Sequence, residues 1–116
     1  MIVDDDSAVL RALHELLVEW GFDAVRFSNF EDARAYLGTN APDALIVDVR
    51  LGMFNGLQLV HLAKQVDAGM TVIAMSGFDD PVLRAEAASV GALYMVKPVN
   101  LEDLHRRLQS PDSPAV

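Results

Sequence analysis

Short apolar runs alternate with longer amphipathic segments along this chain. Two of the runs, residues 44–48 and 71–75, are almost uninterrupted, and such runs are typical of strands buried on both faces of a parallel sheet. Three weaker runs have similar strand character. The predicted strands are residues 1–3, 23–27, 44–48, 71–75 and 93–96.

Apolar residues recur at helical spacing in the segments between these strands. Ser28 and Glu31 have capping-box spacing and begin the second helix, which ends near Gly38. Asp80 and Pro81 form an N-cap and first-turn pair for the fourth helix. The predicted helices are residues 7–20, 28–38, 56–67, 81–90 and 101–108.

The alternation of five strands with five helices predicts an α/β fold with right-handed crossovers. We expect a flavodoxin-like, doubly wound (βα)5 domain over residues 1–109, with a five-stranded parallel sheet in the order 2-1-3-4-5. Residues 110–116 contain two Ser and two Pro among seven residues, which is typical of a tail or linker. The chain is therefore predicted to hold one domain and a short C-terminal extension.

Polar and charged residues follow four of the predicted strands. Asp4 and Asp5 follow the first strand, and Asp48 ends the third. Ser76 follows the fourth strand and Lys97 the fifth. In doubly wound sheets the ligand site lies beyond the carboxyl ends of the strands, so we expect these side chains to meet at one rim of the sheet.

Three carboxylates at one rim repel each other unless a cation lies among them. Oxygen ligands of this kind suit a hard divalent ion, and Mg²⁺, which keeps several waters, fits best. Asp48 can then attack phosphorus as a nucleophile and form an aspartyl phosphate. The Lys97 ammonium neutralises charge on the transferring group, and the Ser76 hydroxyl donates a hydrogen bond to it. The predicted chemistry is Mg²⁺-dependent phosphoryl transfer.

Five motifs in the expected order resemble those of the receiver domain of bacterial response regulators in two-component signalling. They are VDDD at residues 3–6, IVDVRL at 46–51, GL at 56–57, MSG at 75–77 and VKP at 96–98. The resemblance spans residues 1–109. It implies a phosphoprotein of phosphorelay signal transduction that accepts a phosphoryl group on Asp48 from a histidine kinase or a histidine phosphotransfer protein. Such a domain is a signalling phosphoacceptor and not an enzyme, although it assists its own phosphorylation and dephosphorylation.

The resemblance also implies roles for individual residues. It implies that Asp5, Asp48 and the backbone carbonyl of Arg50 ligate Mg²⁺. Asp4 assists this ion directly or through water. The Lys97–Pro98 bond resembles the family's cis peptide bond, which is in general a proline feature.

A conformational switch is implied by the same resemblance. Ser76 and Lys97 are drawn to the phosphoryl group, and Tyr94 then swings inward. This movement changes the face formed by the fourth helix, the fifth strand and the fifth helix. We further expect Arg50 and Phe78, which flank the phosphoryl group, to tune its hydrolysis by shaping water access.

Three features depart from the family pattern. The first strand has only three residues before the acidic pair, where the family usually has more. Gly52 stands where a proline is common. Asp6 occupies a position where the family varies, so it is not counted as a ligand. None of these departures removes a predicted catalytic group.

The amino-acid composition argues against direct binding to nucleic acids or membranes and against secretion. Seventeen acidic residues against nine Lys and Arg give a net charge of −8, and such a surface repels the phosphates of nucleic acids. Apolar runs fall short of the roughly 18 residues that a membrane span needs, and the acidic start is unlike a signal peptide. We therefore expect a cytoplasmic protein that binds neither nucleic acid nor membrane directly. Besides the phosphodonor, the expected partners are a downstream output domain or protein and, after phosphorylation, a second copy of the chain.

Three other functions are compatible with parts of this pattern. One is a receiver-like protein-interaction module that works without phosphorylation. Another is an aspartate-nucleophile phosphatase, which usually has a second aspartate two residues after the nucleophile, where this chain has Arg50. The third, a flavodoxin-like cofactor carrier, needs a phosphate-cradling loop after the first strand, where this chain has three consecutive aspartates.

Overall fold

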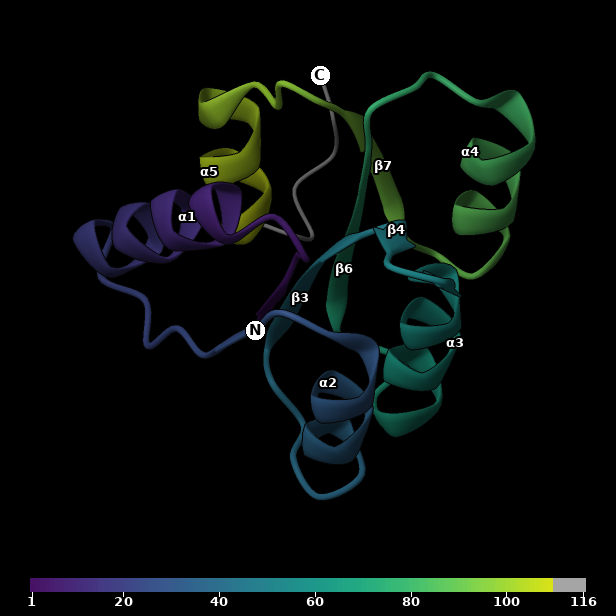
Figure 1. The fold of residues 1–116 in the computed structure, drawn as a ribbon, viewed down its shortest axis with the longest axis horizontal. Helices are drawn as coiled ribbons and strands as arrows, with labels where there is room; N and C mark the ends of the chain where they lie inside the picture. The colour runs from purple at the N-terminus through teal and green to yellow at the C-terminus, as the bar shows by residue number, and fades with distance from the viewer. Residues whose placement is uncertain (110–116) are drawn as a thin grey trace.

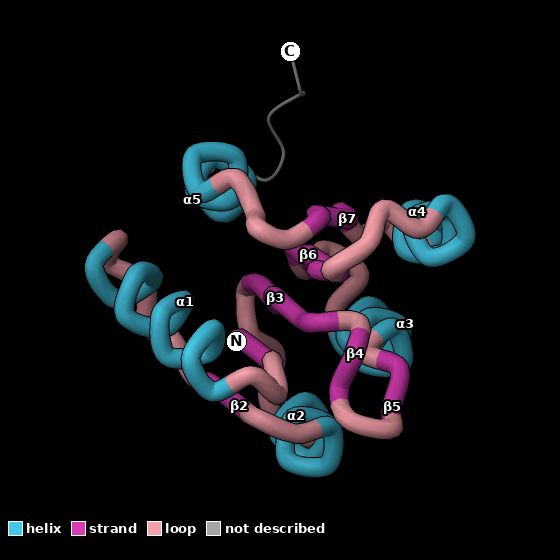
Figure 2. The backbone as a smooth tube through the Cα atoms, turned by 45° about the horizontal axis from the view of Figure 1, so that its top comes forward, coloured by secondary structure: helices cyan, strands magenta, loops and turns pink. Residues whose placement is uncertain are grey.

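The computed structural model describes residues 1–109 and contains a five-stranded parallel sheet with helices on both faces (Figure 1, Figure 2). The strands lie in the order β2 (Arg26–Phe27), β1 (Ile2–Val3), β3 (Ala44–Asp48), β6 (Thr71–Ser76) and β7 (Leu93–Val96). Because β6 and β7 are the fourth and fifth strands of this sheet, the predicted order 2-1-3-4-5 is confirmed. The predicted tail, residues 110–116, lies outside the described residues.

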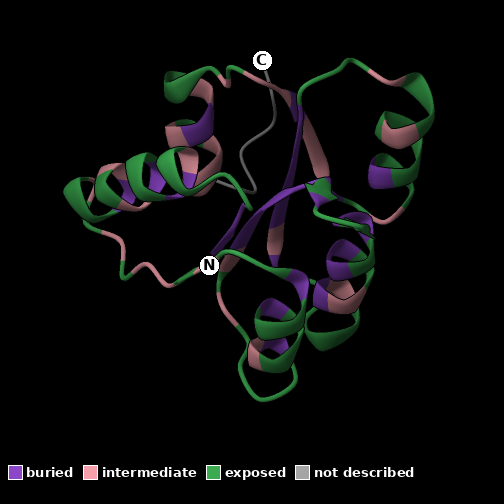
Figure 3. Ribbon diagram, viewed as in Figure 1, coloured by how far each residue is buried: buried purple, intermediate pink, exposed green. Residues whose placement is uncertain are grey.

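Two hydrophobic layers cover the sheet, one on each face. The helices are α1 (Ser7–Glu19), α2 (Phe30–Leu37), α3 (Leu57–Val66), α4 (Pro81–Ser89) and α5 (Leu101–Gln109). α1 and α5 pack with Ile46 of β3, whereas α2, α3 and α4 pack with Leu45 and Val47 of the same strand. Figure 3 shows the buried residues concentrated in the strands and in the helix faces turned toward them. The central strand β3 is therefore buried on both faces, as its continuous apolar run predicts.

Side-chain caps fix where four helices begin, and the side chain of Asn100 caps α5, as predicted. Asp6 accepts hydrogen bonds from two backbone amides in the first turn of α1, at 3.0 and 3.3 Å. Asp80 caps α4, as predicted. The predicted Ser28 cap of α2 is wrong, because Asn29 is extended and its side chain accepts a hydrogen bond from the Asp32 amide at 2.9 Å. Serine and asparagine can both cap a helix, and the turn brings the Asn29 side chain within hydrogen-bond distance of the Asp32 amide.

A hairpin that the sequence pattern does not predict lies between β3 and α3. β4 (Arg50–Leu51) pairs antiparallel with β5 (Phe54–Asn55) through a two-residue turn. Gly52, the first turn residue, has a φ of +60°, as a tight hairpin turn with glycine first requires. Two-residue strands are too short to show alternation in the sequence. β2 is likewise only two residues long, shorter than its predicted range of 23–27.

The layers leave the carboxyl ends of β1, β3 and β6 at one edge of the sheet, beside the hairpin. No helix within residues 1–109 is long and apolar enough to cross a membrane. The polar residues at the carboxyl ends of the strands lie together at this edge of the sheet.

Candidate functional site

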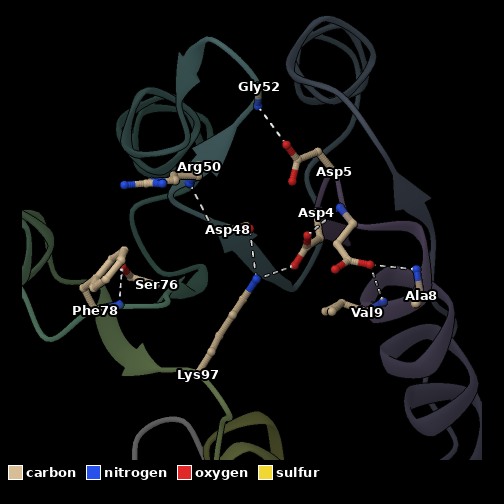
Figure 4. A network of polar contacts seen from close by, with 11 residues as sticks. Asp4, Asp5, Ala8, Val9, Asp48, Arg50, Gly52, Ser76, Phe78 and Lys97 are labelled. Atoms are coloured by element: carbon tan, nitrogen blue, oxygen red, sulfur yellow. Dashed lines mark hydrogen bonds and ion pairs between the residues drawn. The ribbon is translucent and has the colours of Figure 1, made fainter.

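The acidic residues that follow β1 and β3 lie together at the carboxyl edge of the sheet (Figure 4). β1 and β3 are hydrogen-bonded neighbours, with Val3 beside Val47, so the residues after them are adjacent. Asp4, Asp5 and Asp48 each offer one carboxylate oxygen, and these oxygens all lie within 4.8 Å of one another. The structure thus brings Asp48 together with Asp4 and Asp5, which come from a distant segment of the chain.

Lys97 reaches this cluster from β7, which is separated from β3 by β6. Its Nζ donates to Asp48 Oδ2 at 2.9 Å and to Asp4 Oδ2 at 3.0 Å. Its backbone N–H donates to the Ser76 carbonyl at 2.7 Å, and the Lys97–Pro98 peptide bond is cis. One ammonium group therefore bridges two carboxylates and is held through its own backbone as well.

Burial shapes the electrostatics of this cluster. Asp4 is fully buried and Asp48 is 7% exposed. Burial raises the pKa of the Asp4 carboxyl, and hydrogen bonds from the Asp6 amide and Lys97 oppose only part of this effect. For Lys97, burial alone lowers the pKa, but the hydrogen bonds to Asp48 and Asp4 outweigh it and leave the pKa raised. Lys97 therefore stays positively charged at neutral pH.

The charge balance and the donor atoms of this cluster fit a divalent cation. Three carboxylates face one ammonium group, so two negative charges remain without a neighbouring cation. All three donors are oxygens, which hard ions such as Mg²⁺ and Ca²⁺ prefer. Burial raises the pKa of Asp4 even with Lys97 beside it, and the charge of Asp48 adds to the effect. The residues present therefore suit an Mg²⁺- or Ca²⁺-type site.

Asp48 is held in a fixed orientation at the base of the cluster. Its Oδ1 accepts a hydrogen bond from the Arg50 amide at 3.1 Å, while Oδ2 faces Lys97. Behind it, Gly56 lies so close that an added Cβ would overlap the Asp48 carbonyl oxygen. The Gly56 N–H also donates to the Val49 carbonyl at 2.6 Å. The start of α3 therefore packs against the backbone of Asp48 and Val49 at the end of β3.

Ser76 and Tyr94 form a second, separate set of contacts. The Ser76 hydroxyl is buried and accepts a hydrogen bond from the Phe78 amide at 3.2 Å. The Tyr94 hydroxyl donates to the Phe78 carbonyl at 2.8 Å. Figure 4 shows Ser76 and Phe78 apart from the network of Asp4, Asp48 and Lys97. The loop after β6 is thus tied to β7, and Ser76 is directed toward its own loop.

Arg50 and Phe78 contact each other and line a hollow next to the hairpin. The Arg50 guanidinium lies 5.4 Å from the centroid of the Phe78 ring, within the range of a cation–π contact. They line a hollow of about 330 Å³ together with, among others, Met53, Ser76 and Leu83. Val49, which follows Asp48 in the chain, also lines this hollow.

Two glycines contact the acidic residues of the site, although neither was predicted to have a role there. The Gly52 amide donates to Asp5 Oδ2 at 3.0 Å. Gly56 permits the close approach to Asp48 described above. Gly56 directly precedes α3 and Gly52 lies in the hairpin turn. Neither position carries a sequence signal for such a contact, because the partner atoms belong to other segments of the chain. The Gly56-Leu57 motif shows that a glycine stands at this position, but not which backbone contact requires it.

Comparison with known proteins identifies a family match over the described chain. The family described as the response regulator receiver domain matches residues 1–109. The chain is 33% identical over 111 residues to protein RcaC of Microchaete diplosiphon, and 31% identical over 103 residues to the DNA-binding transcriptional regulator NtrC of Salmonella typhimurium. These alignments cover 93% and 88% of this chain but only 17% and 22% of the two relatives. The chain therefore corresponds to a small part of each relative.

Solved structures share the fold. A CheY-like response regulator receiver domain protein from Methanospirillum hungatei superimposes with a TM-score of 0.87 at 25% identity, covering 95% of this chain and 89% of that one. A response regulator from Burkholderia pseudomallei, solved with a phosphorylated aspartic acid, a calcium ion and citrate, superimposes with a TM-score of 0.84 at 21% identity. That alignment covers 99% of this chain and 74% of the other. These similarities confirm the predicted flavodoxin-like architecture.

Proposed function

The chain belongs to the response regulator receiver domain family, and from this premise we propose that Asp48 accepts a phosphoryl group from a phosphohistidine of a partner protein. The observation that carries the proposal is the fixation of the Asp48 carboxylate. The Arg50 amide holds Oδ1 and the Lys97 ammonium holds Oδ2, within an acidic cluster suited to a divalent cation. A buried carboxylate with this environment is poised for nucleophilic attack rather than for capping a loop.

In the proposed reaction a carboxylate oxygen of Asp48 attacks the phosphorus atom. The new phosphorus–oxygen bond forms as the phosphorus–nitrogen bond to the donor imidazole breaks, and the electron pair returns to that nitrogen. Lys97 stays protonated, because Asp48 and Asp4 raise its pKa against the effect of burial. As negative charge builds up on the phosphoryl oxygens, the ammonium group contacts these oxygens. Positioning and charge neutralisation supply most of the catalysis that phosphoryl transfer needs.

We assign the cation site to Asp4, Asp5 and Asp48, with the Arg50 backbone carbonyl as a further ligand, and Mg²⁺ as the ion. When bound, the cation neutralises negative charge on the phosphoryl oxygens. The fit of the three carboxylates supports this assignment. The calcium ion and the phosphorylated aspartic acid in the B. pseudomallei response regulator agree with it.

The contacts of the loop after β6 suggest how phosphorylation changes the surface. Ser76 would leave the Phe78 amide to donate its hydroxyl hydrogen to the phosphoryl group. The loop would then move, and the Tyr94 hydroxyl would lose its bond to the Phe78 carbonyl. Tyr94 would turn inward, and the face made by α4, β7 and α5 would change. A coupling of about 1–3 kcal/mol between the two sites is sufficient for such a shift.

We further propose the setting in which this domain works. Residues 1–109 form the receiver domain, and residues 110–116 form a C-terminal tail or linker. The downstream partner is an output domain or a separate output protein. RcaC and NtrC are much longer than the segment that matches, which agrees with a receiver domain that serves an output function. The domain is cytoplasmic, its phosphodonor is a histidine kinase or a histidine phosphotransfer protein, and phosphorylated chains pair as homodimers. The domain itself acts as a signalling phosphoacceptor and binds neither nucleic acid nor membrane.

Intact-protein mass spectrometry after incubation with acetyl phosphate tests the proposal. The wild-type chain should gain one phosphoryl group when Mg²⁺ is present, and Asp48→Asn should gain none. Asp6→Asn is the matched control, because Asp6 caps α1 outside the carboxylate cluster and Asn caps helices as well as Asp. A folded wild-type chain that gains no phosphoryl group with Mg²⁺ would instead favour a phosphate-independent interaction module.

A further inference from the structure

The tip of the β4–β5 hairpin touches the carboxylate cluster. The Gly52 N–H donates to Asp5 Oδ2 at 3.0 Å, across 47 residues of sequence. In Figure 4 the bonded oxygen of Asp5 faces the hairpin, and the second oxygen lies on the side of Asp4 and Asp48. A carboxylate has two acceptor oxygens, so this bond leaves one oxygen of Asp5 for a cation.

Asp5 differs from the other two carboxylates in how it is held. Asp4 is buried and bonded by the Asp6 amide and Lys97, and Asp48 is bonded by Arg50 and Lys97. Asp5 is exposed, and within residues 1–109 Gly52 supplies the hydrogen bond that holds its side chain. Without that bond an exposed aspartate samples several rotamers, and a cation must fix one of them at an entropic cost.

The hairpin is itself anchored, so the Gly52 amide is presented in a defined place. The Phe54 ring stacks on Phe30 at the start of α2, with ring centroids 4.6 Å apart. Leu51 is buried, and the Asn55 side chain accepts a hydrogen bond from the backbone at the start of α3. The φ of +60° at Gly52 completes the turn. A proline here could neither adopt this φ nor donate an N–H.

We propose that Gly52 is a positioning residue of the cation site, acting through Asp5. The inference rests on the proposed Mg²⁺ site and adds a residue to it. The Gly52 amide preorganises Asp5, so the cation meets three oriented carboxylates instead of two. Coupling between two sites is reciprocal, so a cation on Asp5 also restrains the hairpin tip. That tip carries Met53, whose side chain is fully exposed.

A double-mutant cycle on Mg²⁺ affinity, measured by isothermal titration calorimetry, tests the inference without any activity assay. Gly52→Pro should weaken Mg²⁺ binding by about 3- to 10-fold, the range that corresponds to one hydrogen bond. In an Asp5→Ala background the same change should cause no further loss. A loss of equal size in both backgrounds would mean that Gly52→Pro acts by disturbing the hairpin, and it would overturn the inference.

Gly52→Ala is the matched variant for backbone strain. It introduces a side chain at the same positive φ, where an added Cβ meets nothing within 4 Å, and it keeps the N–H. Its Mg²⁺ affinity should stay closer to that of the wild-type chain than the affinity of Gly52→Pro. Equal losses in the two variants would overturn the inference. A wild-type chain that binds no Mg²⁺ would instead overturn the proposed cation site.

A measurement on the folded wild-type chain covers the case in which Gly52→Pro does not fold. The Gly52 amide proton, followed by NMR, should shift upfield in Asp5→Ala, because its hydrogen bond to a charged oxygen is lost. It should also move when Mg²⁺ is added to the wild-type chain but not when Mg²⁺ is added to Asp5→Ala. A Gly52 amide that ignores both changes would overturn the inference.

Discussion

The contact between Gly56 and the end of β3 allows a sharp test of how the phosphoacceptor is positioned. A Cβ on Gly56 would overlap the Asp48 carbonyl oxygen and would lie 3.0 Å from the Asp48 carbonyl carbon and from the Val49 Cα. All these atoms belong to the backbone, so no side chain can rotate away from the added methyl group. The hydrogen bond from the Gly56 amide to the Val49 carbonyl also resists separation.

We expect Gly56→Ala to lower both the free energy of unfolding and the rate of phosphorylation. Carbon atoms in contact normally lie about 3.5–4.0 Å apart, so α3 or the end of β3 must move on the order of 1 Å. Overpacking usually costs about 1–3 kcal/mol, and two rigid backbones place this case near the upper value. That loss corresponds to a fall in Tm of roughly 10–15 °C. A displacement of about 1 Å at a reacting group slows a reaction about 10- to 100-fold.

Urea unfolding and the rate of mass gain from acetyl phosphate with Mg²⁺ measure the two effects. Gly77→Ala is the matched control, because Gly77 lies on the same rim beside Ser76 and an added Cβ there meets nothing within 4 Å. Its free energy of unfolding should change by less than about 0.5 kcal/mol. If Gly56→Ala kept the wild-type unfolding curve and the wild-type rate, the close approach would have no part in positioning Asp48.

Three further predictions concern the neighbouring groups. Burial raises the pKa of Asp4, so in metal-free protein its ionised carboxylate lowers the free energy of unfolding at neutral pH. This destabilisation disappears as the pH falls through the raised pKa toward the unfolded value of 3.8. Urea unfolding should therefore show Asp4→Asn as more stable than wild type at neutral pH, with the gap closing in acid, while Mg²⁺ titration shows weaker binding. Tyr94→Phe removes the bond to the Phe78 carbonyl and should speed phosphorylation about 2- to 10-fold, as loss of one resting-state hydrogen bond allows; an unchanged or slower rate contradicts this. Arg50→Ala and Phe78→Ala enlarge the hollow that both residues line and should speed loss of the phosphoryl group from isolated phosphoprotein. Unchanged phosphoryl lifetimes would exclude a shielding role.

Local sequence patterns were sufficient to predict the main elements of the fold. The apolar runs at residues 44–48 and 71–75 predict buried parallel strands, and β3 and β6 occupy these ranges almost residue for residue. Asp80 marks the start of α4 correctly. These signals are local, because strand burial and helix capping each depend on residues a few positions apart.

The positions of the acidic and basic groups along the chain also predict where the site lies. A parallel sheet places the carboxyl ends of its strands at one edge, so Asp4, Asp48 and Lys97 had to come near each other once the strand order was known. The motifs that contain them carry the family resemblance, and the family match over residues 1–109 agrees with it.

The tertiary structure decided how those groups meet and which backbone atoms assist them. Lys97 bridges Asp4 and Asp48, and the Gly52 amide reaches Asp5 across 47 residues. The hairpin at residues 50–55 has strands of two residues, which are too short to leave a periodic signal. Such contacts depend on where distant segments lie after the chain has closed on its core, and on turn geometry and atomic clearances that a one-dimensional pattern does not contain. Local patterns in the sequence therefore predict the main helices and strands and the chemistry at the rim, while packing fixes the hairpin and the orientation of each group.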